Sequence, residues 1–236
     1  MSELTDIFSM MKINITETQE KQLNKFYEML IERNKVMNLT TITEYSQVVI
    51  KHYADSAAIA NVTDMESDMR IIDVGTGAGF PGIVLKIIFP HLSLTLLDSL
   101  NKRINFLKEV ISELQLEDIR AVHARAEDFA RVKDEREKYD LCVSRAVANL
   151  SSLSEYCLPF VKVGGIFISY KAENCEEEIK TADKAVKLLG GTIKDIITCE
   201  IPASDIKRKF IVVEKKKSTP AKYPRKAGLP AKEPLI

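Results

Sequence analysis

The sequence predicts an α/β fold, with a doubly wound, mainly parallel sheet and helices on both faces. From Met69 onward, runs of β-branched and other apolar residues alternate with amphipathic stretches of helical length. Alternating strands and helices form right-handed βαβ units, which place successive strands in parallel. A glycine-rich segment directly follows the first run. Both observations are typical of a sheet that binds a ligand at its strand ends.

Seven runs have the length and composition of strands. They cover residues 70–74, 93–98, 119–123, 139–143, 165–169, 193–201 and 210–213, and helical stretches lie near 82–89, 101–114, 149–160 and 174–190. The loop between the last two runs has no helical pattern. We therefore expect the final strand to be an antiparallel insertion in an otherwise parallel sheet.

The first 61 residues show helical patterns and no strand. Thr16-Glu17-Thr18-Gln19 is a helix-start signal, and apolar residues follow at three- and four-residue steps from Leu23 to Ile31. A second, shorter helix is expected from about Glu44 to Asn61. The chain thus divides into an N-terminal helical cap (1–61), an α/β core (62–214) and an irregular, Lys- and Pro-rich tail (215–236).

Composition limits the classes of protein that fit. The 34 basic and 34 acidic side chains cancel, so the total charge gives no sign of a nucleic-acid partner. Four cysteines and three histidines are scattered without the spacing of a zinc site or a disulfide framework. The N-terminus lacks an export signal, and no apolar stretch is long enough to cross a bilayer. We expect a reduced, cytoplasmic monomer without metal or membrane contact.

The most informative motif is the glycine loop, Asp73-Val74-Gly75-Thr76-Gly77-Ala78-Gly79-Phe80-Pro81-Gly82. Glycine allows positive φ and close approach to a ligand, and the following helix start offers free N–H groups. Four glycines within eight residues exceed what a turn alone needs. We therefore predict that a ligand binds on this loop.

Two ligands compete for the loop. Gly77 to Gly82 match the dinucleotide pattern GxGxxG, which would indicate NAD. Against this, Asp73 could pair with the ammonium group of S-adenosylmethionine but would repel a pyrophosphate. Asp98 ends the second strand and could hold the ribose hydroxyls of either cofactor.

Polar residues also follow the third and fourth strands. Glu127 follows the third strand, although it would also suit a plain helix N-terminus, and Arg145 follows the fourth. Ligands of open parallel sheets bind beyond the carboxyl ends of the strands. Four side chains should therefore converge on one crevice: Asp73, Asp98, Glu127 and Arg145.

Motifs along essentially the whole chain resemble one family. The Phe80-Pro81-Gly82 extension of the glycine loop and the prolyl-basic segment 223–230 are the most specific. Shorter motifs are Asn38-Leu39-Thr40, His52-Tyr53-Ala54-Asp55-Ser56, Leu97-Asp98-Ser99, Lys102-Arg103, Arg125-Ala126-Glu127 and Ser144-Arg145-Ala146. Together they resemble the ribosomal RNA small subunit methyltransferase G family, also called glucose-inhibited division protein B. The resemblance implies a seven-stranded Rossmann-like methyltransferase sheet, S-adenosyl-L-methionine as cofactor, and methylation of a guanine N7 in small-subunit (16S) ribosomal RNA.

The resemblance, added to the residue patterns, names candidates for the site. The catalytic candidates are Arg145, Arg125 and His52, although without the family match His52 would be assigned to packing. The cofactor candidates are Asp73, Gly75, Gly77, Gly79, Phe80, Asp98, Ser99, Leu100, Ala126, Glu127 and Arg145. Candidates for contact with the RNA or the ribosomal subunit are Lys102, Arg103, Lys171, Arg208, Arg225 and Lys226.

The tail is the local basic cluster in this neutral chain. From Lys215 onward, seven Lys or Arg residues stand against one acid, Glu233. The tail could bind RNA phosphates, and Lys215 to Lys217 could instead be a solvated strand end.

Methylation at N7 would place few demands on acid–base groups. N7 carries a free lone pair, so no general base is needed, and in-line positioning at about 3–3.5 Å can supply roughly 7–11 kcal/mol. Arg145 or Arg125 could hold the base through guanine O6. Because N7 faces the narrow major groove of an RNA helix, the base must be unpaired or flipped out.

Other functions remain open at this point. The alternatives are an NAD-binding oxidoreductase or regulatory protein, a non-catalytic ribosome-assembly factor, and a small-molecule methyltransferase. Intact Asp73, Gly75 and Gly77 argue against a relic pocket, and the basic tail argues against a small substrate.

Overall fold

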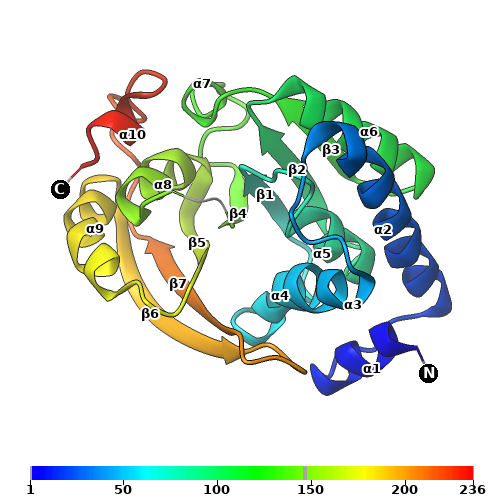
Figure 1. Cartoon of the computed structure of the whole chain (residues 1–236). Helices are drawn as coiled ribbons and strands as arrows, with labels where there is room; N and C mark the ends of the chain where they lie inside the picture. The colour runs from blue at the N-terminus through cyan, green and yellow to red at the C-terminus, as the bar shows by residue number, and fades with distance from the viewer. Residues whose placement is uncertain (1, 146–147, 236) are drawn as a thin grey trace.

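The computed structural model describes residues 2–145 and 148–235, and within them a seven-stranded sheet lies between two layers of helices (Figure 1). The strands are β1 (Arg70–Val74), β2 (Ser93–Asp98), β3 (Ile119–His123), β4 (Tyr139–Ser144), β5 (Val161–Lys171), β6 (Gly191–Glu200) and β7 (Lys207–Lys215). Their order is β3-β2-β1-β4-β5-β7-β6. Strands β1 to β5 pair in parallel, and β7 lies antiparallel between β5 and β6. The predicted fold class and antiparallel insertion are both confirmed.

The strand order reverses at β1, and this reversal positions the site. From β1 the chain continues to β2 and β3 on one side, then returns to β4 on the other. In the register, Asp73 of β1 lies beside Leu96 of β2 and Val143 of β4. Ligands of open α/β sheets bind at such a switch point, beyond the carboxyl ends of the strands.

The helices agree with the predicted pattern except at the N-terminus and at two four-residue helices, α7 and α10, the second of which lies in the tail that was expected to be irregular. They are α1 (Glu3–Met10), α2 (Glu17–Met37), α3 (Tyr45–Val48), α4 (Asp55–Ala57), α5 (Gly82–Ile88), α6 (Asn101–Glu113), α7 (Ala126–Phe129), α8 (Leu150–Cys157), α9 (Glu176–Leu188) and α10 (Leu229–Lys232). A π-helical segment, η1 (Val49–Ala54), and 3-10 segments η2 (Ala58–Asn61) and η3 (Leu158–Phe160) continue α3, α4 and α8. The predicted helix at 44–61 is thus a succession of α, π and 3-10 turns, and α1 had no signal in the sequence patterns. None of these described helices is long and apolar enough to cross a membrane.

Alternate residues of the central strands face two separate cores. Ile71 packs in the core under α1 to α6, whereas Ile72 and Val74 pack in the core under α7, α8 and α9. Because both faces of the sheet are covered, its strands have nearly continuous apolar sequences. Gln19, in the capping box of α2, donates to two carbonyl oxygens at the end of α5 and so ties the cap to the core.

The tail packs against the core although most of its backbone is irregular (Figure 1, red). Lys215 is fully buried, and its ammonium donates to the Leu158 carbonyl at 2.5 Å and the Thr219 hydroxyl at 2.6 Å. Burial lowers the pKa of Lys215 to about 8. Lys216 pairs with Glu214 at 2.6 Å. The expectation of a solvated basic strand end is therefore wrong for Lys215, because the fold encloses its charge.

Candidate functional site

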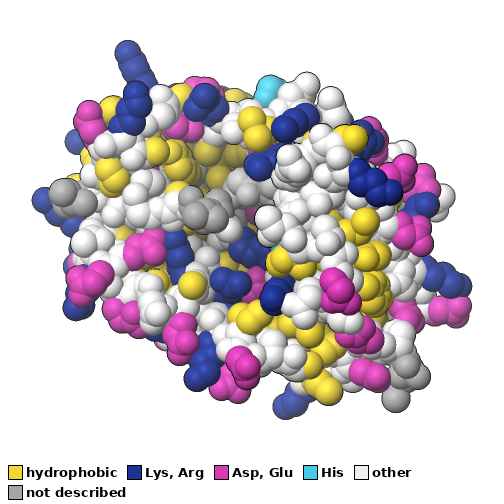
Figure 2. Space-filling model, viewed as in Figure 1, with side chains coloured by type: hydrophobic (Ala, Val, Ile, Leu, Met, Phe, Trp, Pro, Cys, Tyr) yellow, Lys and Arg dark blue, Asp and Glu magenta, His cyan; other side chains and the backbone are white. Residues whose placement is uncertain are grey.

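A pocket of about 750 Å³ opens at the carboxyl ends of β1 to β4. Small-ligand sites have volumes of roughly 300–1,000 Å³. The structure brings Asp98, Glu127 and Arg145 to the wall of this pocket, together with the glycine-loop residues 75–78 and Phe80. Figure 2 shows this face, hollowed between α7 and α8, with apolar side chains in the hollow and Lys and Arg side chains around it.

Asp73 supports the glycine loop from beneath. Its side chain is fully buried, and Oδ2 accepts hydrogen bonds from the Thr76 hydroxyl at 2.7 Å and the Gly82 N–H at 2.9 Å. A Cβ added to Gly82 would lie 2.2 Å from Leu96 Cδ2 and 2.9 Å from Asp73 Oδ2, so a larger residue there would displace one of these two buried side chains. Burial raises the pKa of Asp73 to about 6, against the effect of these hydrogen bonds. Within the described residues, Oδ1 has no hydrogen-bond partner, and Asp73 does not line the pocket.

Asp98 places a carboxylate against the open side of the loop. It accepts hydrogen bonds from the N–H of Gly77 at 3.0 Å, the N–H of Leu100 at 2.9 Å and the guanidinium of Arg103 at 3.3 Å. Gly77 has a positive φ of 63°, which turns its N–H toward this carboxylate. Asp98 therefore occupies the N–H that a pyrophosphate would need, and it would repel that group. Hydroxyl or ammonium groups can instead share its oxygens.

Glu127 and two tail residues close the pocket at the β3 end. Glu127 lies in the first turn of α7, the helix that follows β3. In the sheet, β2 and β1 separate β3 from β4. Its nearly buried carboxylate accepts a hydrogen bond from the Gly228 N–H at 2.8 Å. Gly228 and Ala231 line the pocket beside it. The sequence reasoning missed this wall, for which the only signal was the motif at 223–230.

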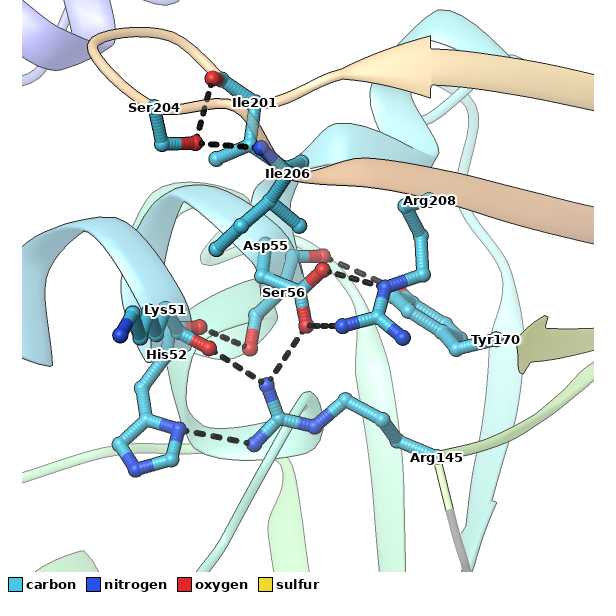
Figure 3. A network of polar contacts seen from close by, with 10 residues as sticks. All are labelled: Lys51, His52, Asp55, Ser56, Arg145, Tyr170, Ile201, Ser204, Ile206 and Arg208. Atoms are coloured by element: carbon cyan, nitrogen blue, oxygen red, sulfur yellow. Dashed lines mark hydrogen bonds and ion pairs between the residues drawn. The ribbon is translucent and has the colours of Figure 1, made fainter. Parts of the chain in front are cut away.

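Three charged side chains from distant elements meet beside the other end of the pocket (Figure 3). Asp55 of α4 is only 1% exposed. Its Oδ1 accepts from Arg208 Nε of β7 at 2.6 Å, and its Oδ2 accepts from Arg208 Nη2 at 3.1 Å and from Arg145 Nη1 at 2.9 Å. We call Asp55, Arg145 and Arg208 the Asp55 clamp. The clamp holds the guanidinium of Arg145, the residue that directly follows β4, in one position.

His52 is a neutral ring beside Arg145. Its Nδ1 accepts from Arg145 Nη2 at 3.3 Å, so Nε2 carries the proton and donates to the Thr40 hydroxyl at 2.9 Å. The ring stacks on Phe80, with 4.5 Å between the ring centroids. Burial, and then the charge of Arg145, lowers the pKa of His52 to about 4. At neutral pH, His52 thus has no free lone pair with which to accept a proton.

Arg145 keeps hydrogen-bond donors for a ligand. A guanidinium carries five N–H donors. Nη1 donates to Asp55 and to the Lys51 carbonyl, and Nη2 donates to His52. Across the described ranges, no acceptor takes the second N–H of Nη2 or the N–H of Nε. Because Arg145 lines the pocket, these two donors can serve a ligand.

The low pKa of His52 predicts a pH-dependent contribution to stability. A histidine whose pKa falls on folding stabilises the folded state above its unfolded pKa, and this contribution is lost as the pH falls through both values. Between pH 7 and pH 4, we expect the free energy of unfolding to fall by about 2–3 kcal/mol more in the wild type than in His52→Gln. Urea denaturation of both proteins across this range measures the two free energies of unfolding. Other titrating groups such as Asp73 contribute equally to both proteins, so they cancel when the two pH profiles are subtracted. If the free energy of unfolding depends on pH in the same way in the wild type and in His52→Gln, the fold does not hold His52 neutral.

The other predicted residues divide between the pocket wall and its surroundings. Those that line the pocket are Gly75, Gly77, Phe80, Ser99, Leu100, Arg103, Arg125 and Ala126. Those that do not are Gly79, Lys102, Lys171, Arg208, Arg225 and Lys226. Ala146 lies outside the described residues.

The basic candidates differ in what they already bind. Lys171 is nearly buried and donates to the Ala148 carbonyl and to Glu178, both at 2.6 Å. Arg225 is likewise paired inside the fold, whereas Lys102, Arg125 and Lys226 are exposed. The number of charges in the sequence could not distinguish the cations that are paired inside the fold from those that are exposed.

Several pocket residues were not predicted. Thr40 belongs to the Asn38-Leu39-Thr40 motif, which by itself indicates no role, and Leu153 and Tyr156 of α8 carry no signal beyond helical spacing. In the part of the chain that the structure describes, no cluster of three His, Cys, Asp or Glu side chains could hold a metal ion.

Comparisons with known proteins agree with this geometry. The family model for rRNA small subunit methyltransferase G (GidB) matches residues 19–209. The protein named ribosomal RNA small subunit methyltransferase G from Alkaliphilus oremlandii is 52% identical over 225 residues, which cover 95% of this chain and 94% of that protein. The protein of the same name from Acetivibrio thermocellus is 52% identical over 219 residues, covering 92% and 90%.

Solved structures share the fold at low identity. TYW2 from M. jannaschii in complex with AdoMet has a TM-score of 0.54 and 15% identity, covering 73% of this chain and 77% of that one. TYW2 from P. horikoshii in complex with MeSAdo has a TM-score of 0.54 and 16% identity, covering 69% and 61%. These structures support the fold, whereas the family model and the relatives match most of the sequence. The chain therefore belongs to the rRNA small subunit methyltransferase G family.

Proposed function

We propose that the protein transfers a methyl group from S-adenosyl-L-methionine to N7 of a guanine in 16S ribosomal RNA. The observation that carries the proposal is a single pocket with carboxylates at one end and a fixed guanidinium at the other. Asp98 and Glu127 suit the hydroxyl and amino groups of an adenosine, and Arg145 suits a carbonyl oxygen of a base. The name shared by the relatives supports ribosomal RNA as the substrate.

The acids around the glycine loop fit this cofactor. Asp98 would accept hydrogen bonds from the ribose hydroxyls, and Glu127 would accept one from the adenine amino group. The buried Oδ1 of Asp73, which has no hydrogen-bond partner among the described residues, adds negative potential behind the loop, which favours a cationic ligand over a pyrophosphate. When bound, the cofactor supplies an electrophilic methyl group on a sulfonium. The same arrangement disfavours NAD.

The site residues act by positioning rather than by moving a proton. Guanine N7 attacks through a free lone pair, and both nitrogens of His52 are engaged by Arg145 and Thr40. Placing N7 in line with the methyl group at about 3–3.5 Å can supply roughly 7–11 kcal/mol of the barrier reduction. The neutral state of His52 also avoids an additional positive charge beside the reacting groups.

We assign Arg145 to the guanine base. Guanine presents N7 and O6 on the same edge, both as acceptors. A donor from Arg145 to O6 would hold the base and leave N7 free for reaction. The positive charge of Arg145 opposes the charge that N7 acquires, and the Asp55 carboxylate bound to the same guanidinium weakens that opposition.

The exposed cations are the better candidates for RNA phosphates. Arg125 lines the pocket, and its side chain makes no hydrogen bond or ion pair among the described residues. Lys102 and Lys226 are also exposed. Arg208 and Lys171 are already paired, with Asp55 and Glu178 respectively. We therefore place the RNA over the pocket mouth, with an unpaired guanine entering toward Arg145.

Incubation with methyl-tritiated S-adenosylmethionine tests the proposal. The substrates are naked 16S RNA and, separately, small subunits from cells that lack this modification, and the products are analysed as nucleosides. Labelled 7-methylguanosine is the expected result, and a different labelled nucleoside would overturn the N7 assignment. Cofactor binding without any labelled RNA would favour an assembly factor or a small-molecule substrate.

A further inference from the structure

The C-terminal strap, which we define as residues 225–233, is anchored by a buried ion pair. Glu155 of α8 is 0% exposed. Arg225 donates to it from Nε at 3.0 Å and 3.1 Å, from Nη2 at 2.7 Å and from its backbone N–H at 2.7 Å. A carboxylate enclosed in this way depends on its partner, because an unpaired buried charge is costly. Arg225 is therefore fixed within the fold rather than projecting toward solvent.

From this anchor the strap contacts both α8 and α7, and in Figure 1 its helix α10 lies next to α8. The Ser152 hydroxyl of α8 donates to the Pro230 carbonyl at 2.7 Å. The Gly228 N–H donates to Glu127 of α7 at 2.8 Å. Gly228 itself, and Ala231, which directly follows Pro230, line the pocket. The strap is thus held on both sides of the opening.

The strap closes the end of the pocket that lies away from the Asp55 clamp. Glu127 follows β3 and Arg145 follows β4, with β2 and β1 between them. Three strand spacings of about 4.8 Å separate these positions across the sheet. A change in the strap should therefore act on the ligand at the Glu127 end and leave the group held by Arg145 in place.

We propose that Gly228 and Ala231 of the strap form a wall of the cofactor site and that the Arg225–Glu155 ion pair positions them. This rests on the proposed function, because the ligand at the Glu127 end is taken to be the adenosyl part of the cofactor. Arg225 and Glu155 are then positioning residues for cofactor binding, although the basic tail suggested RNA contact. Losing the anchor should raise the Kd of the cofactor and change turnover at saturating cofactor much less.

Calorimetric titration of the full chain with S-adenosyl-L-homocysteine tests the strap. Arg225→Ala and Glu155→Gln are each expected to raise the Kd at least tenfold. The double variant should resemble the single variants, because both remove the same anchor. Lys232→Ala is the matched control, since it removes an exposed positive charge from the same strap outside the pocket wall. Its Kd should equal that of the wild type.

A second variant tests the wall even where the anchor variants fail to fold. Ala231 is exposed at the pocket wall, so Ala231→Glu adds bulk and negative charge there without disturbing the core. It is expected to weaken binding at least tenfold, whereas Lys232→Glu should not. If the wild type binds and the folded variants at Arg225, Glu155 and Ala231 all stay within twofold of it, the strap proposal is overturned. If the wild type itself binds neither S-adenosylmethionine nor S-adenosylhomocysteine, the proposed function is at fault instead.

Discussion

Replacing Arg145 by alanine is expected to lower kcat/KM for methyl transfer by about 100-fold or more while the protein stays folded. The variant loses the donors that hold guanine, and misplacement of a reacting atom by about 1 Å is enough for such a loss. Folding should persist because Asp55 keeps both hydrogen bonds from Arg208. The measurement is tritium transfer to unmodified small subunits at saturating cofactor, with thermal unfolding as a check on the fold.

Two further variants separate the roles of the two arginines. Arg145→Lys keeps the charge but loses the planar fork, so we expect it to stay strongly impaired. Arg125→Ala removes an exposed cation at the pocket wall, so its main effect should be a higher KM for RNA. Wild-type turnover in folded Arg145→Ala, or a larger kcat loss in Arg125→Ala, would contradict the assignment of Arg145 to the base.

The fold could be predicted because its signals are local. Strands buried on both faces have continuous apolar sequences, and the helices between them have a clear period, so each element is visible in its own residues. Helix α1 is different: it spans eight residues, and only tertiary packing buries its Leu4 and Phe8. A short helix of this kind carries too few periodic positions to be recognised alone.

The site could be predicted where sheet topology determines it. Parallel strands place their carboxyl ends at one edge, and this rule alone brings Asp98, Glu127 and Arg145 to one pocket. The same rule says which strand end a residue follows but not which way its side chain points. Asp73 shows the difference, since it lies at the expected strand end but faces the underside of the loop.

The tail and the clamp could not be predicted because they depend on partners far away in the sequence. Arg225 and Glu155 are 70 residues apart, and Arg208 and Asp55 are 153 residues apart. No local pattern reports such pairs. The sequence shows how many basic residues the tail contains, but it does not show which of them solvent or RNA can reach. Lys215 is buried and Lys226 is exposed.

Replacing Asp55 by alanine is expected to impair both stability and methyl transfer. Breaking a fully buried ion pair costs about 3–5 kcal/mol. The side chains of Arg145 and Arg208 are 16% and 21% exposed, and water can partly replace the lost carboxylate. We therefore expect a loss of about 2–4 kcal/mol in the free energy of unfolding, measured by urea denaturation. Asp55→Asn keeps one acceptor oxygen and should lose less.

A double-mutant cycle then decides whether Asp55 acts on catalysis through Arg145. Freed from Asp55, the guanidinium of Arg145 keeps the Lys51 carbonyl and His52 as partners, so its position should loosen rather than be lost. We expect kcat for folded Asp55→Asn to lie between those of the wild type and Arg145→Ala. In the Arg145→Ala background, Asp55→Asn should change kcat little, because the residue that Asp55 positions is already absent. If the two losses multiply independently, Asp55 acts on the reaction by a route other than Arg145, and the proposal that the clamp positions Arg145 for catalysis is wrong.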